Sequence, residues 1–277
     1  MKRIDLKKQD HDIKIGMKCE ALEPNITEDT LFILDGVPIG FYIKDISTYS
    51  QKAADLADLA DKELRSDRVP KQEMSRGPQG DKAAKAKRLA EGKELVVQFS
   101  TILGGVAAKP HMRRNYPTIS SVHRVATARN FIKAMLLLAK ESEQIIKTII
   151  PELYEQQKQL IKESVPEKYR FAELFTSSIS NFNIAANYHL DTANLKGCCN
   201  VIISKRMGTT GGNTTVPDYG ATVNSGDNSM LVYPAWMNVH GVTPIEKTQK
   251  DGYRNTLVFY PLGSFKKYLE SDDAVNG

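Results

Sequence analysis

Long hydrophobic runs are missing from this 277-residue sequence. The longest apolar stretch, residues 134–139, is far too short to span a bilayer, so we expect no membrane partner. The first residues alternate charged and isolated apolar side chains and lack the apolar core of a secretory signal. We therefore expect an intracellular, soluble protein.

Cysteine is also scarce, and the three that occur are Cys19, Cys198 and Cys199. Two sequential neighbours on a strand would point to opposite faces, so this set favours neither a disulfide framework nor a zinc site. A hydrophobic content of 41% and a charged content of 26% are typical of a globular chain. The length suits one compact domain over residues 1–277, which we expect to be a monomer.

Acidic residues are absent from residues 95–140. The same segment holds seven basic residues, namely Lys109, Arg113, Arg114, Arg124, Arg129, Lys133 and Lys140. A basic loop around Arg76 precedes it. This distribution fits a surface that binds a phosphate backbone, and a solvated face without a partner is the alternative. A site that requires a polyanionic substrate would favour the first interpretation.

The first part of the chain, residues 1–175, is expected to hold a hairpin and helices. Two apolar runs around Asp35-Gly36 predict a β-hairpin over residues 32–43. Composition and an apolar spacing of three or four predict helices over residues 51–65, 81–91 and 122–150. Pro151 suits the first turn of a further helix that runs toward residue 162.

From residue 180 the apolar spacing changes to two, which predicts strands. In a strand over residues 182–191, the apolar face would hold Phe182, Ile184, Ala186, Tyr188 and Leu190. The polar face would hold Asn183, Asn187, His189 and Asp191. His189 and Asp191 should therefore project side by side into one cavity.

Further short strands are predicted over residues 199–205, 230–233 and 255–260, with a turn at Gly211-Gly212. We expect a catalytic β core over residues 176–265 and a tail over residues 266–277. The predicted fold class is α+β, with a double-stranded β-helix (jelly-roll) core and an N-terminal helical elaboration packed on its major sheet.

Two histidines and an aspartate carry the strongest chemical signal. His189-x-Asp191 followed by His240 supplies two neutral imidazoles and a carboxylate, the facial ligand set expected for Fe(II). Arg254 and Thr256 share one face of the last predicted strand, where a guanidinium and a hydroxyl can hold the distal carboxylate of 2-oxoglutarate. A surface ion pair of Arg254 is the alternative interpretation.

Three segments together resemble the catalytic core of the TET and J-binding-protein dioxygenases: residues 189–194 (HLDTAN), 240–244 (HGVTP) and 254–260 (RNTLVFY). The resemblance covers residues 175–262 well, extends loosely from residue 32 onward and is closest to short virus-encoded members. It implies Fe(II), 2-oxoglutarate and O2 as cofactors, and a host cytoplasmic location if the chain is viral.

The resemblance also implies roles for single residues. His189, Asp191 and His240 would bind iron, whereas Arg254, Thr256 and Asn200 would bind the cofactor. Asn194 would hydrogen-bond a base flipped out of duplex DNA, and Tyr260 would stack on it, which offsets the cost of unstacking. The charge distribution, and not the resemblance, predicts that Arg76, Arg113 and Arg114 contact the DNA. For Arg113 and Arg114, a helix cap or pairing with acidic residues is the alternative. Two positions depart from the animal enzymes, because Ala193 and Leu262 stand where those have histidines.

The function expected from the resemblance is hydroxylation of the 5-methyl group of 5-methylcytosine in DNA, with further oxidation left open. Thymine in DNA is an alternative substrate, because an asparagine amide both donates and accepts hydrogen bonds and Asn194 can therefore serve either base. A protein side chain or small molecule is a second alternative substrate. A nucleic-acid-binding module without turnover is a third interpretation, against which the intact ligand set argues.

Overall fold

The computed structural model describes residues 1–73, 82–92, 97–108 and 116–269. The predicted DNA contacts Arg76, Arg113 and Arg114 lie outside these residues. Within them, no helix is long and apolar enough to cross a membrane.

The bounds of the helices and strands are as follows. The α-helices are α1 (Gln51–Arg65), α2 (Lys82–Ala90), α3 (Arg129–Ile149) and α4 (Pro151–Ser164). The strands of the first half are β1 (Lys2–Asp5), β2 (Thr30–Leu34), β3 (Val37–Ile43), β4 (Gln72–Glu73), β5 (Phe99–Val106) and β6 (Thr118–Ile119). Those of the second half are β7 (Ser177–Phe182), β8 (Ala186–His189), β9 (Asn200–Met207), β10 (Thr209–Gly211), β11 (Thr214–Val216), β12 (Ala221–Val223), β13 (Met230–Tyr233), β14 (His240–Val242), β15 (Ile245–Lys247) and β16 (Tyr253–Tyr260).

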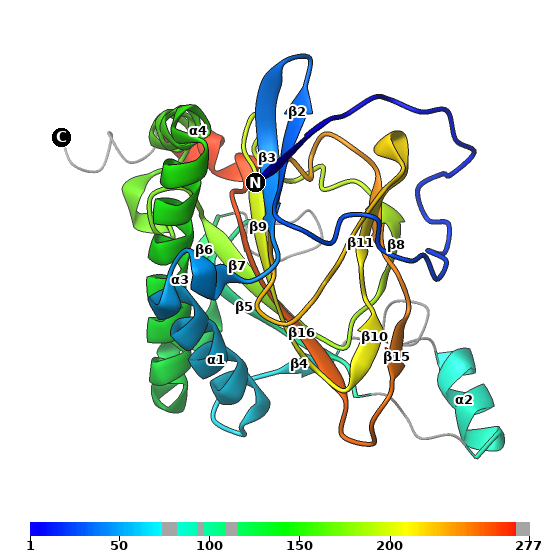
Figure 1. The fold of residues 1–277 in the computed structure, drawn as a ribbon. Coiled ribbons are helices and arrows are strands. Elements are labelled where there is room, and N and C mark those ends of the chain that lie inside the picture. Colours follow the sequence, from blue (N-terminus) through cyan, green and yellow to red (C-terminus); the bar gives the residue numbers. More distant parts are fainter. Residues whose placement is uncertain (74–81, 93–96, 109–115, 270–277) are drawn as a thin grey trace.

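Two sheets face each other across the site (Figure 1). The major sheet of the described residues has ten strands, in the order β1-β2-β3-β13-β9-β16-β7-β5-β4 with β6 paired to β5. The minor sheet has the order β12-β11-β14-β8, and β10 pairs with β15 beside it. The mixed α+β arrangement of a large antiparallel sheet and a smaller one is that of a double-stranded β-helix, so the predicted fold class is confirmed.

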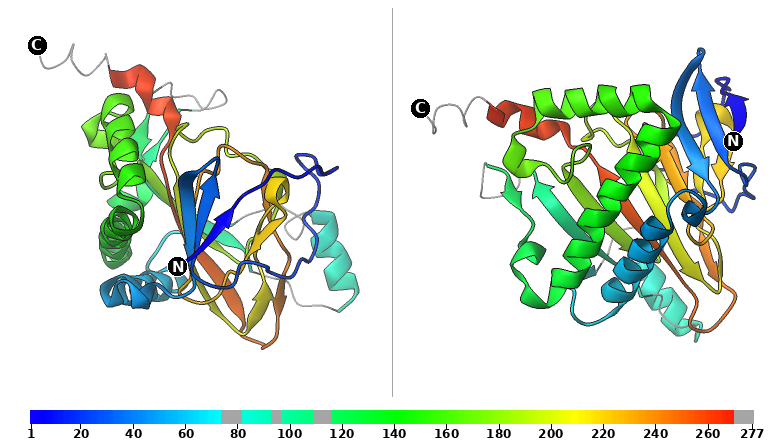
Figure 2. Two further views of the ribbon diagram at one scale, coloured as in Figure 1. Left: turned by 45° about the horizontal axis from the view of Figure 1, so that its top comes forward. Right: turned by 60° about the vertical axis from the view of Figure 1, so that its left-hand side comes forward.

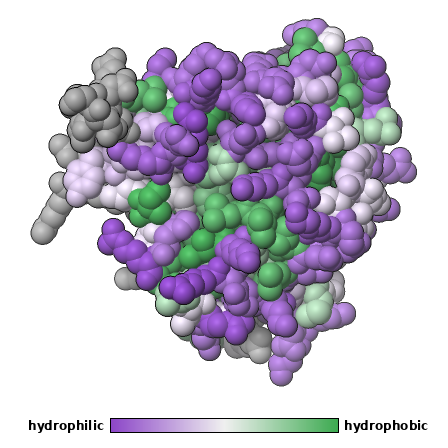
Figure 3. Space-filling model, turned by 90° about the vertical axis from the view of Figure 1, so that its left-hand side faces the viewer, coloured by the Kyte–Doolittle hydropathy of each residue, from purple (hydrophilic) through white to green (hydrophobic). Residues whose placement is uncertain are grey.

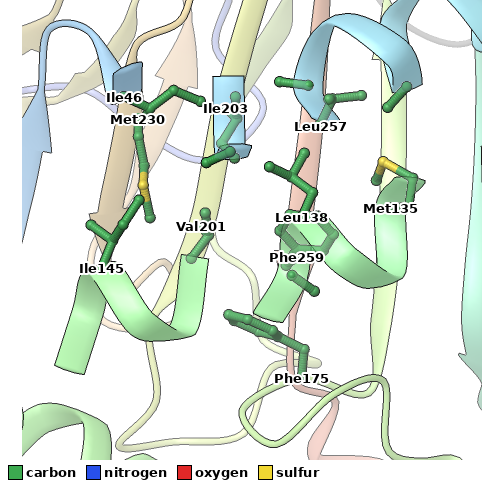
Figure 4. Packing of buried hydrophobic residues seen from close by; sticks show 14 of the residues in the cluster. Ile46, Met135, Leu138, Ile145, Phe175, Val201, Ile203, Met230, Leu257 and Phe259 are labelled. Carbon is green, nitrogen blue, oxygen red and sulfur yellow. The ribbon is translucent and has the colours of Figure 1, made fainter. Parts of the chain in front are cut away.

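Helices α1, α3 and α4 cover the outer face of the major sheet (Figure 2). The alternation of the strands explains why. On β16, Leu257 and Phe259 point to the helices and are fully buried, and Met135 and Leu138 of α3 meet them there (Figure 4). This hydrophobic layer leaves the other face of β16 free to line the space between the sheets.

The predicted hairpin is confirmed, since β2 pairs antiparallel with β3. Asp35 and Gly36 between them both have positive φ, as the two-residue turn between twisted strands requires. Helix α1 has the predicted bounds, and α2 and α4 agree within two residues. Helix α3 begins later than predicted, since 3-10 turns at Ser121–Arg124 and Ala126–Ala128 precede it.

The prediction of one strand over residues 182–191 is wrong. Strand β7 ends at Phe182 in the major sheet, and β8 begins at Ala186 in the minor sheet. The chain turns between them at Asn183, whose φ of 55° is incompatible with a strand. An alternating pattern continued through this crossover, so spacing alone did not reveal it.

The outer face of the helical layer is hydrophilic with a strip of hydrophobic side chains (Figure 3). In α3, Ile132, Leu136 and Ile149 remain partly exposed while packing on the core. Nothing in the described part of the chain covers this strip, and the monomeric state stays a prediction.

Buried polar contacts tie α1 to the back of β16. Asp61 of α1 is 3% exposed and accepts hydrogen bonds from the Tyr253 hydroxyl at 2.8 Å and from Asn255 Nδ2 at 3.1 Å. Arg65 Nε donates to the same carboxylate at 3.0 Å. These contacts flank Arg254, whose side chain leaves the opposite face of the strand.

Replacing Asp61 should therefore destabilise the fold. In Asp61→Ala, the buried amide of Asn255 and the Tyr253 hydroxyl lose their acceptor, and the free energy of unfolding in urea should fall by about 2–3 kcal/mol. Asp55→Ala is the matched control. Among the described residues, the exposed Asp55 hydrogen-bonds only Gln51 one turn away, so its loss should change stability by less than about 0.5 kcal/mol. Equal losses in the two variants would contradict the account.

Candidate active site

Two strands of the minor sheet bring three candidate metal ligands together. Antiparallel pairing of β8 with β14 places His189 directly opposite His240, and Asp191 follows β8 by two residues. One side-chain ligand atom from each residue lies within 4.8 Å of the other two. The predicted juxtaposition of His189 and Asp191 is therefore confirmed, with His189 Nε2 at 3.6 Å from Asp191 Oδ1. His240 is the first residue of β14.

Both imidazoles are held in the same way. His189 Nδ1 hydrogen-bonds the carbonyl oxygen of Asn187 at 2.8 Å, and His240 Nδ1 that of Asn238 at 3.0 Å. A carbonyl only accepts, so Nδ1 carries the proton and Nε2 is left with its lone pair for a metal. Burial, then the neighbouring His189, lower the pKa of His240, which favours the neutral form that coordinates metals.

Two asparagines orient the Asp191 carboxylate. Asn194 Nδ2 and Asn200 Nδ2 donate to Asp191 Oδ2 at 3.2 and 3.1 Å. Asn194 Nδ2 also donates to Asn200 Oδ1 at 2.9 Å. Both hydrogens of the Asn194 amide are thus used, and only its oxygen is left to accept. The expectation that this amide can donate to a substrate as well is wrong for this arrangement.

Strand β16 lines the cavity beside these groups. Arg254, Thr256, Val258 and Tyr260 all face a cavity of about 330 Å³ that also contacts His189, Asp191, Asn194, Asn200 and His240. The predicted alternation of this strand is confirmed. Asn183 and Asn187, in contrast, are not among the lining residues. Asn183 binds the backbone of Arg254 instead, since its Oδ1 accepts from Arg254 N at 2.9 Å.

Arg254 is a buried cation that has no carboxylate partner among the described residues. It is 2% exposed, and its Nε and Nη2 donate only to the Ser225 hydroxyl, at 3.2 and 3.0 Å. Burial, then the charge of Arg206, lower the pKa of Arg254 to about 9. A buried guanidinium normally pairs with an anion, so this one is suited to an acidic ligand.

Two residues around Arg254 were missed by the sequence analysis. Ser225 supplies its only side-chain acceptor within the described chain, and no spacing pattern marks a serine in a loop. Gly212 leaves room for it, because a Cβ there would lie 2.4 Å from Arg254 Cδ. The prediction of a turn at Gly211-Gly212 is wrong, because β10 and β11 continue in the same register along β15 and β14 and Gly211 ends β10.

Aromatic and small residues complete the cavity wall. The Tyr233 ring meets His240 edge-on at 5.4 Å, and burial raises the pKa of its hydroxyl. Burial, then the Asp191 charge, raise the pKa of Tyr260, so both phenols stay neutral. Ala193 and Leu262 also line the cavity. They add apolar surface at the two positions where the animal enzymes of the family have histidines.

The donor set fits a specific cofactor pair. Two imidazole nitrogens and one carboxylate suit Fe(II), and the buried Arg254 in the same cavity suits the far carboxylate of a dicarboxylic acid. The fold and this site define the class of 2-oxoglutarate-dependent Fe(II) oxygenases, which use O2 as oxidant. Residues 107–262 match the family Tet_JBP, described as the oxygenase domain of the 2OGFeDO superfamily, and the chain belongs to that family.

Several solved structures are similar to this chain. NgTET1 in complex with 5mC DNA is similar with a TM-score of 0.56 and 12% identity, covering 92% of this chain and 84% of that one. A full-length protein from Neurospora crassa in complex with alpha-KG has a TM-score of 0.40 and 12% identity, covering 80% and 74% of the two chains. A 2OG-Fe(II) oxygenase family oxidoreductase from Burkholderia pseudomallei has a TM-score of 0.37 and 13% identity, covering 74% and 88%. No curated protein matches the chain by sequence.

Proposed function

We propose that the protein hydroxylates the 5-methyl group of 5-methylcytosine in DNA, giving 5-hydroxymethylcytosine. One observation carries the proposal: a single cavity brings together the His-Asp-His cluster, the buried arginine and the pair Asn194 and Tyr260. The membership in Tet_JBP and the fold shared with NgTET1, which was solved with 5mC DNA, support the substrate class.

Within this proposal, His189, Asp191 and His240 hold Fe(II), and Asn194 and Asn200 fix the carboxylate. Arg254 binds the distal carboxylate of 2-oxoglutarate, and Thr256 lies two residues along the same face. Asn200, which we expected to bind the cofactor, is better assigned as a positioning residue for Asp191 because both ends of its amide are engaged there.

The base is proposed to enter the cavity from a flipped nucleotide. Asn194 lines the cavity and retains only acceptor capacity. Position 4 of 5-methylcytosine carries an amino donor, whereas thymine carries a carbonyl there, so an accepting Asn194 favours 5-methylcytosine. Tyr260, neutral and on the same wall, supplies an aromatic surface for the ring. The DNA contacts of Arg76, Arg113 and Arg114 stay predictions.

The chain's own part in the reaction is positioning and exclusion of water. When bound, Fe(II) with 2-oxoglutarate and O2 supplies the oxidation, in which the 2-oxo acid becomes succinate and CO2 and the methyl group gains one oxygen atom. Arg254 and the three ligands fix one reactant, and Asn194 and Tyr260 fix the other. The apolar wall that includes Ala193 and Leu262 keeps water away from the methyl group.

Removing a metal ligand should abolish turnover. His189→Ala and Asp191→Ala should each lose formation of succinate that depends on DNA, because two remaining ligands cannot hold iron in the geometry that the reaction requires. The measurement is succinate released from 2-oxoglutarate. Asp251→Ala, an exposed turn residue, is the control and should keep wild-type turnover. Full turnover in either ligand variant would reject the metal assignment.

Disturbing the arginine should weaken cofactor binding. Arg254→Ala should raise the dissociation constant for 2-oxoglutarate by about 10- to 100-fold, as expected for a lost charge-assisted hydrogen bond of about 1.5–3 kcal/mol. Gly212→Ala should raise it in the same direction, because its new methyl displaces the arginine.

Gly36→Ala is the matched control for Gly212→Ala. Both glycines have positive φ, 80° at Gly36 and 68° at Gly212, but a Cβ at Gly36 meets nothing within 4 Å. Calorimetric titration with 2-oxoglutarate should therefore show wild-type affinity for Gly36→Ala. Unchanged affinity in Arg254→Ala would remove its proposed role.

The substrate is tested with duplex DNA that contains both 5-methylcytosine and thymine. The protein is incubated with Fe(II), 2-oxoglutarate and this DNA. The DNA is then digested to nucleosides, which are separated and identified by mass spectrometry. Oxidised 5-methylcytosine without oxidised thymidine is expected. Oxidised thymidine alone would assign the alternative base, and no oxidised nucleoside would reject DNA methyl oxidation.

A further inference from the structure

The segment between β1 and β2 runs across the minor sheet. After β1, paired to β2 at the edge of the major sheet, the dark blue chain in Figure 1 crosses to the side of β8 and β11 and then returns. We call residues 9–19 the N-terminal strap. It leads from the edge of the major sheet to β8 at the edge of the minor sheet, and its contacts lead toward both histidines of the site.

The first set of contacts reaches His189. The strap adds to the edge of β8, because Gly16 N donates to Tyr188 O at 2.7 Å and Tyr188 N donates to Met17 O at 2.9 Å. Asn187 Nδ2 donates to Gly16 O at 3.2 Å. The carbonyl of the same Asn187 accepts from His189 Nδ1. The strap therefore holds the residue that orients the His189 ring.

A second set of contacts reaches His240. His11 Nε2 lies 2.7 Å from Asp218 Oδ1, and Gln9 N donates to Asp218 O at 2.7 Å. The other carboxylate oxygen of Asp218 accepts from Asn238 Nδ2. The carbonyl of Asn238 then accepts from His240 Nδ1 at 3.0 Å. The strap is thus linked, through Asp218, to the residue that orients the His240 ring.

The two sets of contacts, which we call the first and the second route, have a similar arrangement. Each histidine lies two residues after an asparagine, in Asn187-Tyr188-His189 and in Asn238-Val239-His240. In each, the asparagine carbonyl accepts from the ring. The side-chain amide of Asn187 donates to Gly16 of the strap, and that of Asn238 donates to Asp218, which the strap contacts. A backbone carbonyl can orient a ring only if its own peptide is held, so the amide contacts restrict both rings.

Packing supports the same arrangement. Cys19 at the end of the strap is 3% exposed. At Gly241, next to His240, a Cβ would lie 3.0 Å from the Tyr188 ring and 3.2 Å from Cys19 Sγ. The strap, β8 and β14 are therefore in close contact on the side away from the cavity.

We propose that the N-terminal strap is a positioning element of the metal site, which sets the orientation of both histidine ligands through Asn187 and Asn238. The proposal rests on the proposed function in that His189 and His240 hold the metal. Neither the strap residues nor the two asparagines belong to the candidate ligand set, so their effect should be on affinity and ligand geometry.

Gly16→Ala is the direct test. Gly16 has a φ of 91° and open space around a new Cβ, so the substitution strains the backbone that bonds β8 without any clash. Gly36→Ala is the matched control, with a φ of 80°, equally open space and a place in the β2–β3 turn. The probe is Co(II), a stable substitute for Fe(II), followed by calorimetry and by its visible absorption spectrum.

Asp218→Ala tests the second route. It removes the carboxylate that joins His11 to Asn238. Its control is Asn25→Ala, which cuts contacts of the same N-terminal segment with Gly220 and Thr222 but lies on neither route. Urea unfolding of all four variants measures how much stability each loses.

The expected result is a Co(II) dissociation constant raised about 10-fold in Gly16→Ala and in Asp218→Ala, with an altered Co(II) spectrum and wild-type values in both controls. Co(II) affinity and spectra in these two variants equal to those of their controls would overturn the strap proposal, as would equal weakening in the controls. Wild-type protein that binds no Co(II), or His189→Ala that binds it as tightly as wild type, would instead reject the metal site itself.

Discussion

The antiparallel pairing of β8 with β14 is the constraint on which the site depends. It sets His189 opposite His240, which no local sequence feature could achieve because strands β9 to β13 lie between the two histidines in the chain. Asp191 follows His189 by two residues and lies beside it, with Oδ1 3.6 Å from His189 Nε2. A shift of this register by one residue would turn one imidazole to the outer face of the sheet.

The remaining parts of the molecule serve this pairing from two sides. The helical layer buries one face of β16, so that its other face presents Arg254 to the cavity. On the far side, the N-terminal strap lies along β8 and reaches β14. Between these layers, Asn194 and Asn200 satisfy the Asp191 carboxylate, whereas the Arg254 guanidinium has only the Ser225 hydroxyl as a side-chain acceptor among the described residues and is therefore suited to an acidic ligand.

Local chemistry and spacing predicted the parts that depend on near neighbours. The Asp35-Gly36 turn and the alternation over residues 254–260 follow from conformational preference and the two-residue repeat of a strand, and both are confirmed. The break at Asn183 and the contact of Asn187 with the strap could not be predicted. Both depend on pairing between distant segments, which leaves the alternating pattern unchanged.

The most direct test of the account is an anaerobic titration of the Fe(II) protein with 2-oxoglutarate, followed by the visible band of a 2-oxo acid chelated to iron. The account predicts one binding event per chain, the same band at weaker affinity in Arg254→Ala, and no band in His240→Ala. A band of full strength in His240→Ala, or none in the wild-type protein, would contradict it.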